Sequence, residues 1–223
     1  MICYCCGSNK IHYQNILWQE LISEWRLSKY EVEYINRQQG LHCQNCNSNL
    51  RTMALALSIM KCFGYQGLFK DFVREEKFQH LQILEVNEAG SLTQFLKQIP
   101  GHQLKMYPEL DMMNMKFADI SFDLVVHSDV LEHIQHPIKA LSECYRILKT
   151  GGYCTFTVPM IVDRLTISRV GMPPSFHGLG EPDNLVYTEF GCDAWKQVIQ
   201  AGFQECRLFS IEYPAAQALV AVR

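Results

Sequence analysis

The sequence predicts an α/β protein in which a small N-terminal four-cysteine module precedes a doubly wound, mostly parallel sheet. From residue 81 onward, short apolar runs alternate with amphipathic helical stretches, which is the pattern of parallel strands joined by crossover helices. Residues 1–50 instead contain two Cys-x-x-Cys pairs, which we expect to form a unit of their own. We therefore divide the chain into residues 1–66, the module with a connecting helix, and residues 67–223.

The composition limits the class of protein. With 223 residues, of which 48% are hydrophobic and 19% charged, the chain has room for one α/β domain and a small appendage. No apolar run approaches the roughly 20 residues that a membrane span requires, and the start of the chain lacks the features of a secretion signal. The ten cysteines are too sparse for a disulfide scaffold. We expect a cytoplasmic protein without a membrane span.

The spacing of apolar residues also predicts individual elements. Helices are expected at 51–63, 92–96, 138–148 and 188–201, and strands at 82–86, 104–106, 122–126, 153–158, 203–211 and 218–222. The strand at 122–126 is apolar enough to be buried on both faces of a sheet. Segment 31–36 fits either a strand or a helix.

Cys3, Cys6, Cys43 and Cys46 have the spacing of a tetrahedral zinc site. The thiolates of each pair can hold one edge of the tetrahedron. Cys5 is an alternative ligand, but Cys3-x-x-Cys6 matches Cys43-x-x-Cys46 and is preferred. Because all four ligands come from the protein, we expect a structural Zn²⁺ with no position open to water or substrate.

The position of a ligand site follows from the predicted sheet. In open α/β sheets, ligands bind outside the carboxyl ends of the strands, where the direction of the chain switches. We therefore expect the loop at 87–91, after the first strand, to form the floor of the site. Segment 127–133, after the strand at 122–126, is expected to flank it.

Several motifs indicate a family. The chain resembles the class I S-adenosylmethionine-dependent methyltransferases at Asp111, Ser121-Phe122-Asp123, Val130-Leu131-Glu132-His133 and Arg146-Ile147-Leu148-Lys149-x-Gly151-Gly152. The run Cys43-x-x-Cys46-Asn47-Ser48, followed by Arg51 and a helix, is similar to a bacterial branch with an amino-terminal zinc ribbon. The resemblance implies a Rossmann-like methyltransferase fold, S-adenosylmethionine as cofactor, and a zinc module for stability or docking.

The resemblance also implies cofactor contacts. Members of the family usually carry an acid and then alternating glycines after the first strand; this chain keeps the acid as Glu85 but has Asn87, Ala89 and Ser91 around a single Gly90. Asparagine tolerates positive φ, so the turn remains feasible. The expected cofactor-binding residues are Glu85, Asn87, Gly90, Glu109 at the ribose, Asp111 near adenine, His127 and Leu131.

Two histidines are candidates for the base that removes a proton from the acceptor. His127 lies just past a central strand, and its alternative role is a packed histidine beside the cofactor. His177 lies in the connection from Met160 to Val186, which has the length of a lid or binding segment; its alternative is an inert surface position. Arg164 and Arg169 of this connection are candidates to bind an anionic acceptor.

These observations predict a methyltransferase acting on a small molecule or a glycan. One alternative is a ribosomal RNA base methyltransferase, because such enzymes also pair a four-cysteine zinc module with this fold. Residues 1–61 hold six Lys/Arg against four acids and the net charge is −3, so a nucleic-acid partner is not expected. A second alternative is a non-catalytic scaffold; the altered glycine loop argues for it and the intact Leu131-Glu132-His133 run against it.

Overall fold

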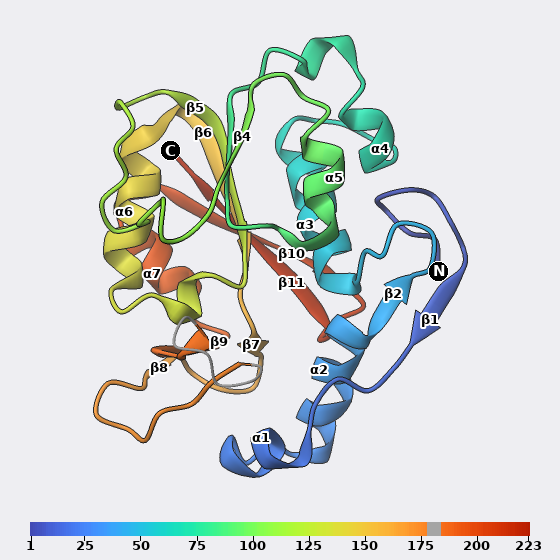
Figure 1. Ribbon diagram of the computed structural model, residues 1–223, viewed down its shortest axis with the longest axis vertical. Coiled ribbons are helices and arrows are strands. Elements are labelled where there is room, and N and C mark those ends of the chain that lie inside the picture. Colours follow the sequence, from blue (N-terminus) through green and yellow to red (C-terminus); the bar gives the residue numbers. More distant parts are fainter. Residues whose placement is uncertain (178–183) are drawn as a thin grey trace.

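The computed structural model of the protein describes residues 1–177 and 184–223 and is built around a six-stranded sheet (Figure 1). The strand order is β10-β11-β6-β5-β3-β4. Pairs from β4 to β6 are parallel, and β11 is antiparallel to both β6 and β10. The expected mostly parallel sheet is thus confirmed, with the bounds β3 (Ile83–Val86), β4 (His102–Lys105), β5 (Phe122–Ser128), β6 (Leu148–Thr157), β10 (Glu205–Ile211) and β11 (Ala216–Val222).

Helices cover both faces of this sheet. Figure 1 shows α3 (Leu50–Cys62) and α5 (Thr93–Leu96) on one face, with α6 (Pro137–Ile147) and α7 (Trp195–Gln200) on the other. The shorter helical elements are α4 (Phe69–Phe72), η1 (Glu76–Phe78), η2 (Gly90–Leu92) and η3 (Leu131–His133). Within the described part of the chain, no helix combines the length and apolar character needed to cross a membrane.

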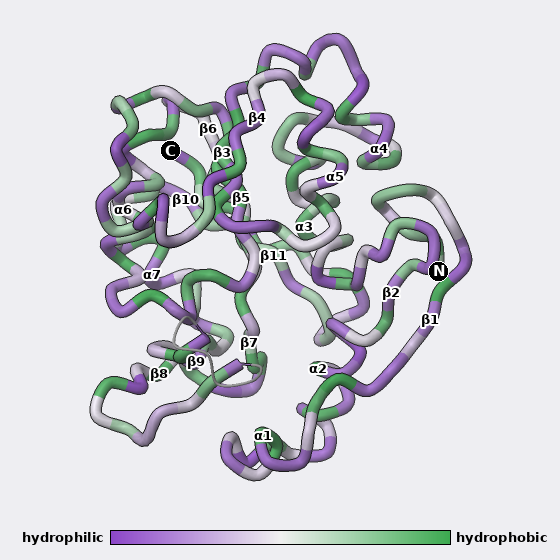
Figure 2. Tube along the Cα trace, viewed as in Figure 1, coloured by the Kyte–Doolittle hydropathy of each residue, from purple (hydrophilic) through white to green (hydrophobic). Residues whose placement is uncertain are grey.

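The core lies where the central strands meet α3. Leu124, Val125 and Val126 of β5 are fully buried, because β3 and β6 flank this strand and helices cover both of its faces. Figure 2 shows hydrophobic segments at the centre of the fold, where α3 lies against β11. α3 falls within the predicted unit 1–66 yet packs on β6, β10 and β11. The division at residue 66 stays a prediction.

One predicted element is wrong. The helix expected at 188–201 is a strand, β9 (Thr188–Gly191), followed by the shorter α7. β9 pairs with β7 (Met160–Ile161) and β8 (Ile167–Ser168) in a small second sheet. These partners lie earlier in the chain and their pairing overrides the local helical spacing.

The N-terminal segment contains two helices and a two-stranded sheet. Its elements are β1 (Ile11–Tyr13), α1 (Gln19–Glu24), α2 (Lys29–Gly40) and β2 (Leu41–Cys43), with β1 antiparallel to β2. The ambiguous segment 31–36 is helical. A capping box decides this: the Ser28 hydroxyl accepts a hydrogen bond from the Glu31 amide, and the Glu31 carboxylate accepts one from the Ser28 amide.

Candidate active site

A topological switch point lies between β3 and β5. The chain continues from β3 to β4 on one side and from β5 to β6 on the other, and Val86 pairs with His127 near the strand ends. Open α/β sheets bind ligands beyond the carboxyl ends of strands at such points. The structure therefore brings together the two loops that the sequence analysis assigned to the ligand site.

Glu85 is fully buried and stabilises the loop after β3 through hydrogen bonds. Its Oε1 accepts hydrogen bonds from the Ala89 amide (2.8 Å) and the Thr93 hydroxyl (2.5 Å), and its Oε2 lies 2.6 Å from Nε2 of His102. Both carboxylate oxygens are therefore used within the chain. Glu85 shapes the expected cofactor loop, and direct contact of Glu85 with a cofactor stays a prediction.

The same loop turns through left-handed backbone at Asn87 (φ 54°) and Gly90 (φ 57°), which these two residue types tolerate. The Asn87 side-chain oxygen accepts a hydrogen bond from the Tyr107 amide (2.9 Å), which ties this loop to the one after β4. A Cβ atom at Gly90 would lie 3.4 Å from the Thr52 hydroxyl. The backbone conformation, more than lack of space, favours glycine there.

Glu109 and Asp111 meet at a cavity of about 320 Å³ beside the end of β4. Glu109 forms an ion pair with Lys105 (2.6 Å), and its side chain is 67% exposed. The Asp111 carboxylate accepts a hydrogen bond from the Met113 amide (2.8 Å). The two acids thus share one accessible cavity, while their contacts with ribose and adenine stay predictions.

A second cavity, of about 280 Å³, lies between the N-terminal helices and the loops after β5 and β6; we call it the acceptor cavity. Its wall on the N-terminal side is apolar and consists of Ile16, Leu17, Trp18, Leu21, Trp25, Leu27 and Ile35. This wall was not predicted from the sequence. The helical spacing of these residues indicates an apolar face but does not indicate which part of the protein that face packs against.

Arg51, in the first turn of α3, reaches the polar end of the acceptor cavity. Its guanidinium forms an ion pair with Asp129 and donates a hydrogen bond to Oε1 of Gln38 (2.5 Å). Burial lowers the pKa of Arg51 to about 10, so the side chain stays charged at neutral pH. Nε of Arg51 and Oδ1 of Asp129 are buried and have no hydrogen-bond partner within residues 1–177 and 184–223. These atoms leave one donor and one acceptor for a polar ligand.

Glu132, His133 and His177 line the same polar end. Oε1 of Glu132 lies 3.8 Å from Nε2 of His133 and 3.9 Å from Nδ1 of His177. Burial raises the pKa of Glu132 and lowers that of His177 to about 3. The candidate base His177 therefore lies at the cavity, next to a motif that the sequence analysis assigned only to the family resemblance.

His127 and Leu131 have a different environment, because both are fully buried. The His127 ring stacks on Phe156 with 4.8 Å between ring centroids, and its Nε2 lies 3.8 Å from the Cys154 sulfur. Burial lowers the pKa of His127 to about 3. Neither residue belongs to the described lining of the two cavities. Their contacts with a cofactor stay predictions, as does the catalytic role of His127.

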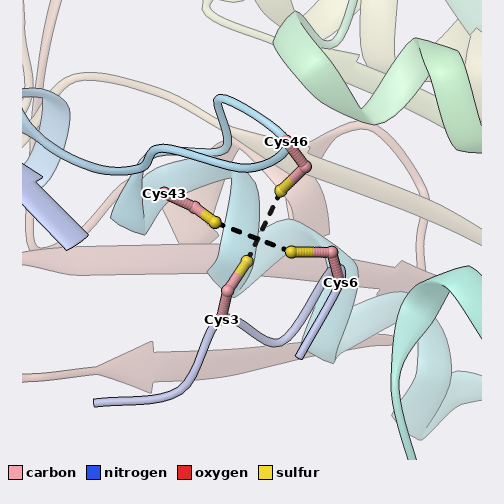
Figure 3. A group of neighbouring side chains, drawn as sticks. All are labelled: Cys3, Cys6, Cys43 and Cys46. Carbon is pink, nitrogen blue, oxygen red and sulfur yellow. Dashed lines mark hydrogen bonds between the residues drawn. The ribbon is translucent and has the colours of Figure 1, made fainter. Parts of the chain in front are cut away.

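The four predicted metal ligands converge on one point, as Figure 3 shows. The sulfurs of Cys3 and Cys46 are 3.6 Å apart, as are those of Cys6 and Cys43. Zinc–sulfur bonds of about 2.3 Å give a tetrahedral edge of about 3.8 Å. The cluster is therefore compatible with a zinc ion, and Cys5 is not part of it.

The cysteine cluster contacts the cofactor loop directly. The Ser48 hydroxyl accepts a hydrogen bond from the Ser91 hydroxyl (2.8 Å), and the Cys46 carbonyl accepts one from the Gln94 side chain (3.0 Å). Asn49, three residues after Cys46, caps α3 by accepting a hydrogen bond from the Thr52 amide (2.8 Å). The module thus bounds the switch point as well as the acceptor cavity.

The two arginines expected to bind an anionic acceptor have partners within the chain. Arg164 donates hydrogen bonds to the Glu31 carboxylate and to the Trp25 and Arg26 carbonyls. Arg169 pairs with Glu189. Both hold the connection after β6 in place, and positions 178–183 of this expected lid lie outside the described residues.

Part of the chain is similar to known proteins. Residues 79–156 match the family described as a methyltransferase domain. A probable S-adenosylmethionine-dependent methyltransferase of Mycolicibacterium smegmatis is 33% identical over 73 residues, which cover 30% of this chain and 27% of that protein. Thiol S-methyltransferase TMT1B of Rattus norvegicus is 35% identical over 100 residues, which cover 43% of this chain and 38% of that protein. The chain thus spans about a third of the length of these two relatives.

Two solved structures are similar to this chain at low sequence identity. An S-adenosylmethionine-dependent methyltransferase of Thermotoga maritima has a TM-score of 0.43 and 15% identity, covering 76% of this chain and 87% of that chain. One from Aquifex aeolicus has a TM-score of 0.40 and 12% identity, covering 63% of this chain and 80% of that chain.

Proposed function

We propose that this protein transfers a methyl group from S-adenosylmethionine to a small molecule with an apolar body. The match of residues 79–156 to a methyltransferase domain supports the class of reaction. The observation that carries the choice of acceptor is the cavity of about 280 Å³, whose apolar wall faces a buried polar end. Cavities that bind small molecules combine apolar walls with a few converging polar groups in this way.

The residues at the switch point fit the cofactor. The unpaired Nε of Arg51 and Oδ1 of Asp129 suit the carboxylate and ammonium groups of an amino-acid moiety. Asn87 and Gly90 would line the cofactor through their left-handed turn, and the remaining expected contacts lie at the second cavity. When bound, S-adenosylmethionine supplies a methyl group on a positively charged sulfur.

The protein's own part in the reaction is to position the acceptor and exclude water. Trp18 and Trp25 would cover the apolar body of the acceptor, while Glu132, His133 and His177 would surround its nucleophilic atom. The acceptor's nucleophilic atom would lie next to His177, which lines the cavity, is 26% exposed and stays the candidate base.

A structural zinc ion at Cys3, Cys6, Cys43 and Cys46 belongs to the same proposal. Four thiols at tetrahedral spacing support a closed site, in which the metal orders the module and does not meet the acceptor. Free thiols of this kind persist in a reducing compartment, which supports a cytoplasmic location.

Isothermal titration calorimetry with S-adenosylmethionine and S-adenosylhomocysteine tests the cofactor part of the proposal. We expect saturable one-to-one binding. Product S-adenosylhomocysteine is then measured with a panel of thiols, phenols and carboxylic acids that carry apolar bodies, and with sugars and RNA for comparison. Trp25→Ala should remove turnover and keep cofactor binding, whereas Trp195→Ala on the exposed face of α7 should change neither. Absence of cofactor binding would favour the scaffold alternative, and turnover of RNA alone would reject the choice of acceptor.

A further inference from the structure

One carboxylate oxygen and two imidazole nitrogens converge in the acceptor cavity without a hydrogen bond between them. Glu132 is 1% exposed, and neither of its carboxylate oxygens has a hydrogen-bond partner in the described ranges 1–177 and 184–223. The distances of 3.8 Å to His133 and 3.9 Å to His177 are too long for hydrogen bonds. A buried carboxyl group without a hydrogen-bond partner is costly in either protonation state, and the charge of Arg51 offsets this cost only for the ionised form. A bound cation would supply the missing partner.

The hydrogen bond that His133 makes leaves its other ring nitrogen free to bind a cation. Its Nδ1 lies 3.0 Å from the carbonyl oxygen of Leu185, which can only accept, so Nδ1 carries the proton and donates it. Nε2 is then left with a free lone pair, and it is Nε2 that points toward Glu132. Histidines that bind metals commonly fix their tautomer and ring orientation through such a hydrogen bond to a carbonyl.

The spacing of the three ligand atoms also suits a metal. One carboxylate oxygen and two imidazole nitrogens lie within 4.8 Å of one another. Bonds of about 2.0–2.2 Å in a tetrahedral site require separations of about 3.4 Å. The two distances from Glu132 exceed this value by about half an ångström, and the two histidine nitrogens would approach each other from at most 4.8 Å. Two histidines and one glutamate form the ligand set of catalytic zinc sites, in which a fourth position stays open. Here that position faces the acceptor cavity, since all three residues line it.

We propose that Glu132, His133 and His177 bind a second Zn²⁺ ion, distinct from the one at the cysteine cluster, with its open position directed into the acceptor cavity. Such a metal would favour a thiol or hydroxyl compound as the acceptor. This choice of acceptor rests on the proposed function, whereas the metal site does not. The sulfur or oxygen of the acceptor binds the metal in place of its proton, and solvent carries the proton away. His177 then acts as a metal ligand and the metal takes over the role of the base.

Metal analysis of the purified full chain tests the site without reference to activity. After incubation with Zn²⁺ and desalting, mass spectrometry of the metal should find two zinc ions per chain. His177→Ala should reduce this number to one, and His136→Ala should leave it at two, because His136 is an exposed histidine near His133. Circular dichroism checks that both variants fold. One zinc ion in the wild type, unchanged in His177→Ala, would overturn the proposal.

Cobalt substitution tests the open position. The spectrum of the Co²⁺ protein minus that of Co²⁺-loaded His177→Ala isolates this site, and we expect visible bands without thiolate charge transfer. Ethanethiol should add a thiolate-to-cobalt band to this difference spectrum; a spectrum that ethanethiol leaves unchanged would reject acceptor ligation. Cofactor binding by calorimetry is independent of these readouts. A protein that binds S-adenosylmethionine but only one metal refutes this inference alone, and one that binds two metals but no cofactor refutes the proposed function alone.

Discussion

Replacement of Arg164 should destabilise the protein by separating the N-terminal helices from the loop after β7. Arg164 lies at 2.7 and 2.9 Å from the two carboxylate oxygens of Glu31, and at 2.8 and 3.0 Å from the carbonyls of Trp25 and Arg26. The side chain of Glu31 is 8% exposed and that of Arg164 is 31% exposed. Arg164→Ala therefore leaves the mostly buried Glu31 carboxylate with the Ser28 amide as its remaining donor, and it removes the donor of the two carbonyls.

The size of this effect follows from the contacts. Hydrogen bonds to charged groups contribute about 1.5–3 kcal/mol each when buried, but the partial exposure of Arg164 screens the ion pair and reduces its share to about 1–2 kcal/mol. The two carbonyl contacts add about 0.5–1 kcal/mol each. We expect Arg164→Ala to lower the free energy of unfolding by about 2–4 kcal/mol at pH 7, a large part of the stability of a typical domain.

The ion-pair part of this loss depends on pH. Burial would raise the pKa of Glu31, but the hydrogen bonds from Arg164 and Ser28 outweigh it and hold this pKa below its ordinary value. A group with a lowered pKa in the folded state stabilises the protein above its unfolded pKa, about 4.3 for glutamate, and loses this contribution as the pH falls through the folded pKa. The difference between wild type and Arg164→Ala should be full at pH 6–7 and shrink below about pH 4.

Urea unfolding followed by circular dichroism measures both effects, and a shift of the midpoint on the order of 1 M corresponds to the expected loss. Arg207→Ala is the matched control, because Arg207 pairs with Glu205 on the surface and should leave the midpoint unchanged. Equal midpoints for wild type and Arg164→Ala at pH 7 would refute the reasoning. A difference of undiminished size at pH 3 would refute the part assigned to Glu31.

Three further predictions concern the candidate site. Cys43→Ser should lose the cluster's zinc and weaken S-adenosylmethionine binding several-fold, because the cysteine loop holds the residues after Gly90; zinc content and calorimetry test this, and undiminished affinity after zinc loss contradicts it. Gly90→Val should weaken the same binding by roughly five- to 150-fold, because a β-branched residue at φ 57° strains the turn by roughly 1–3 kcal/mol; an unchanged Kd contradicts this. Arg51→Met should reduce cofactor affinity more than tenfold while circular dichroism shows a folded protein, since methionine keeps the volume but not the charge; equal affinity removes Arg51 from the cofactor site.

The sheet was predictable because each central strand carries its own signal. Runs such as 83–86 and 122–126 are mostly apolar, and burial on both faces explains this pattern. The prediction of a helix over 188–201 was wrong because its first residues form a strand whose own sequence carries no such signal. The strand β9 depends on pairing with β7 and β8, and its own four residues contain nothing that specifies those partners.

The site divides in the same way. The cysteine cluster was predictable because the spacing within each pair already encodes its geometry. The wall around Trp25 was not, because helical spacing identifies an apolar face without saying what it covers. Glu132 and His177 meet only once the connection after β6 folds back over η3. A signal for Arg51 was present: a charged residue in the first turn of a mostly apolar helix, shortly after the cysteine loop.

The position of Arg51 gives a structural reason for the four-cysteine cluster to precede the six-stranded sheet in the chain. A buried guanidinium loses its hydration, and contacts with Asp129 and Gln38 compensate for this loss. These contacts require a fixed position of α3, the helix that carries Arg51. α3 begins at Leu50, only four residues after Cys46, and Asn49 caps it. A metal that fixes Cys46 therefore fixes the start of α3 and the orientation of Arg51. The same segment bonds to the cofactor loop through Ser48, and the chain before it forms the wall of the acceptor cavity. Order in the cysteine cluster is thus a structural requirement of both halves of the candidate active site.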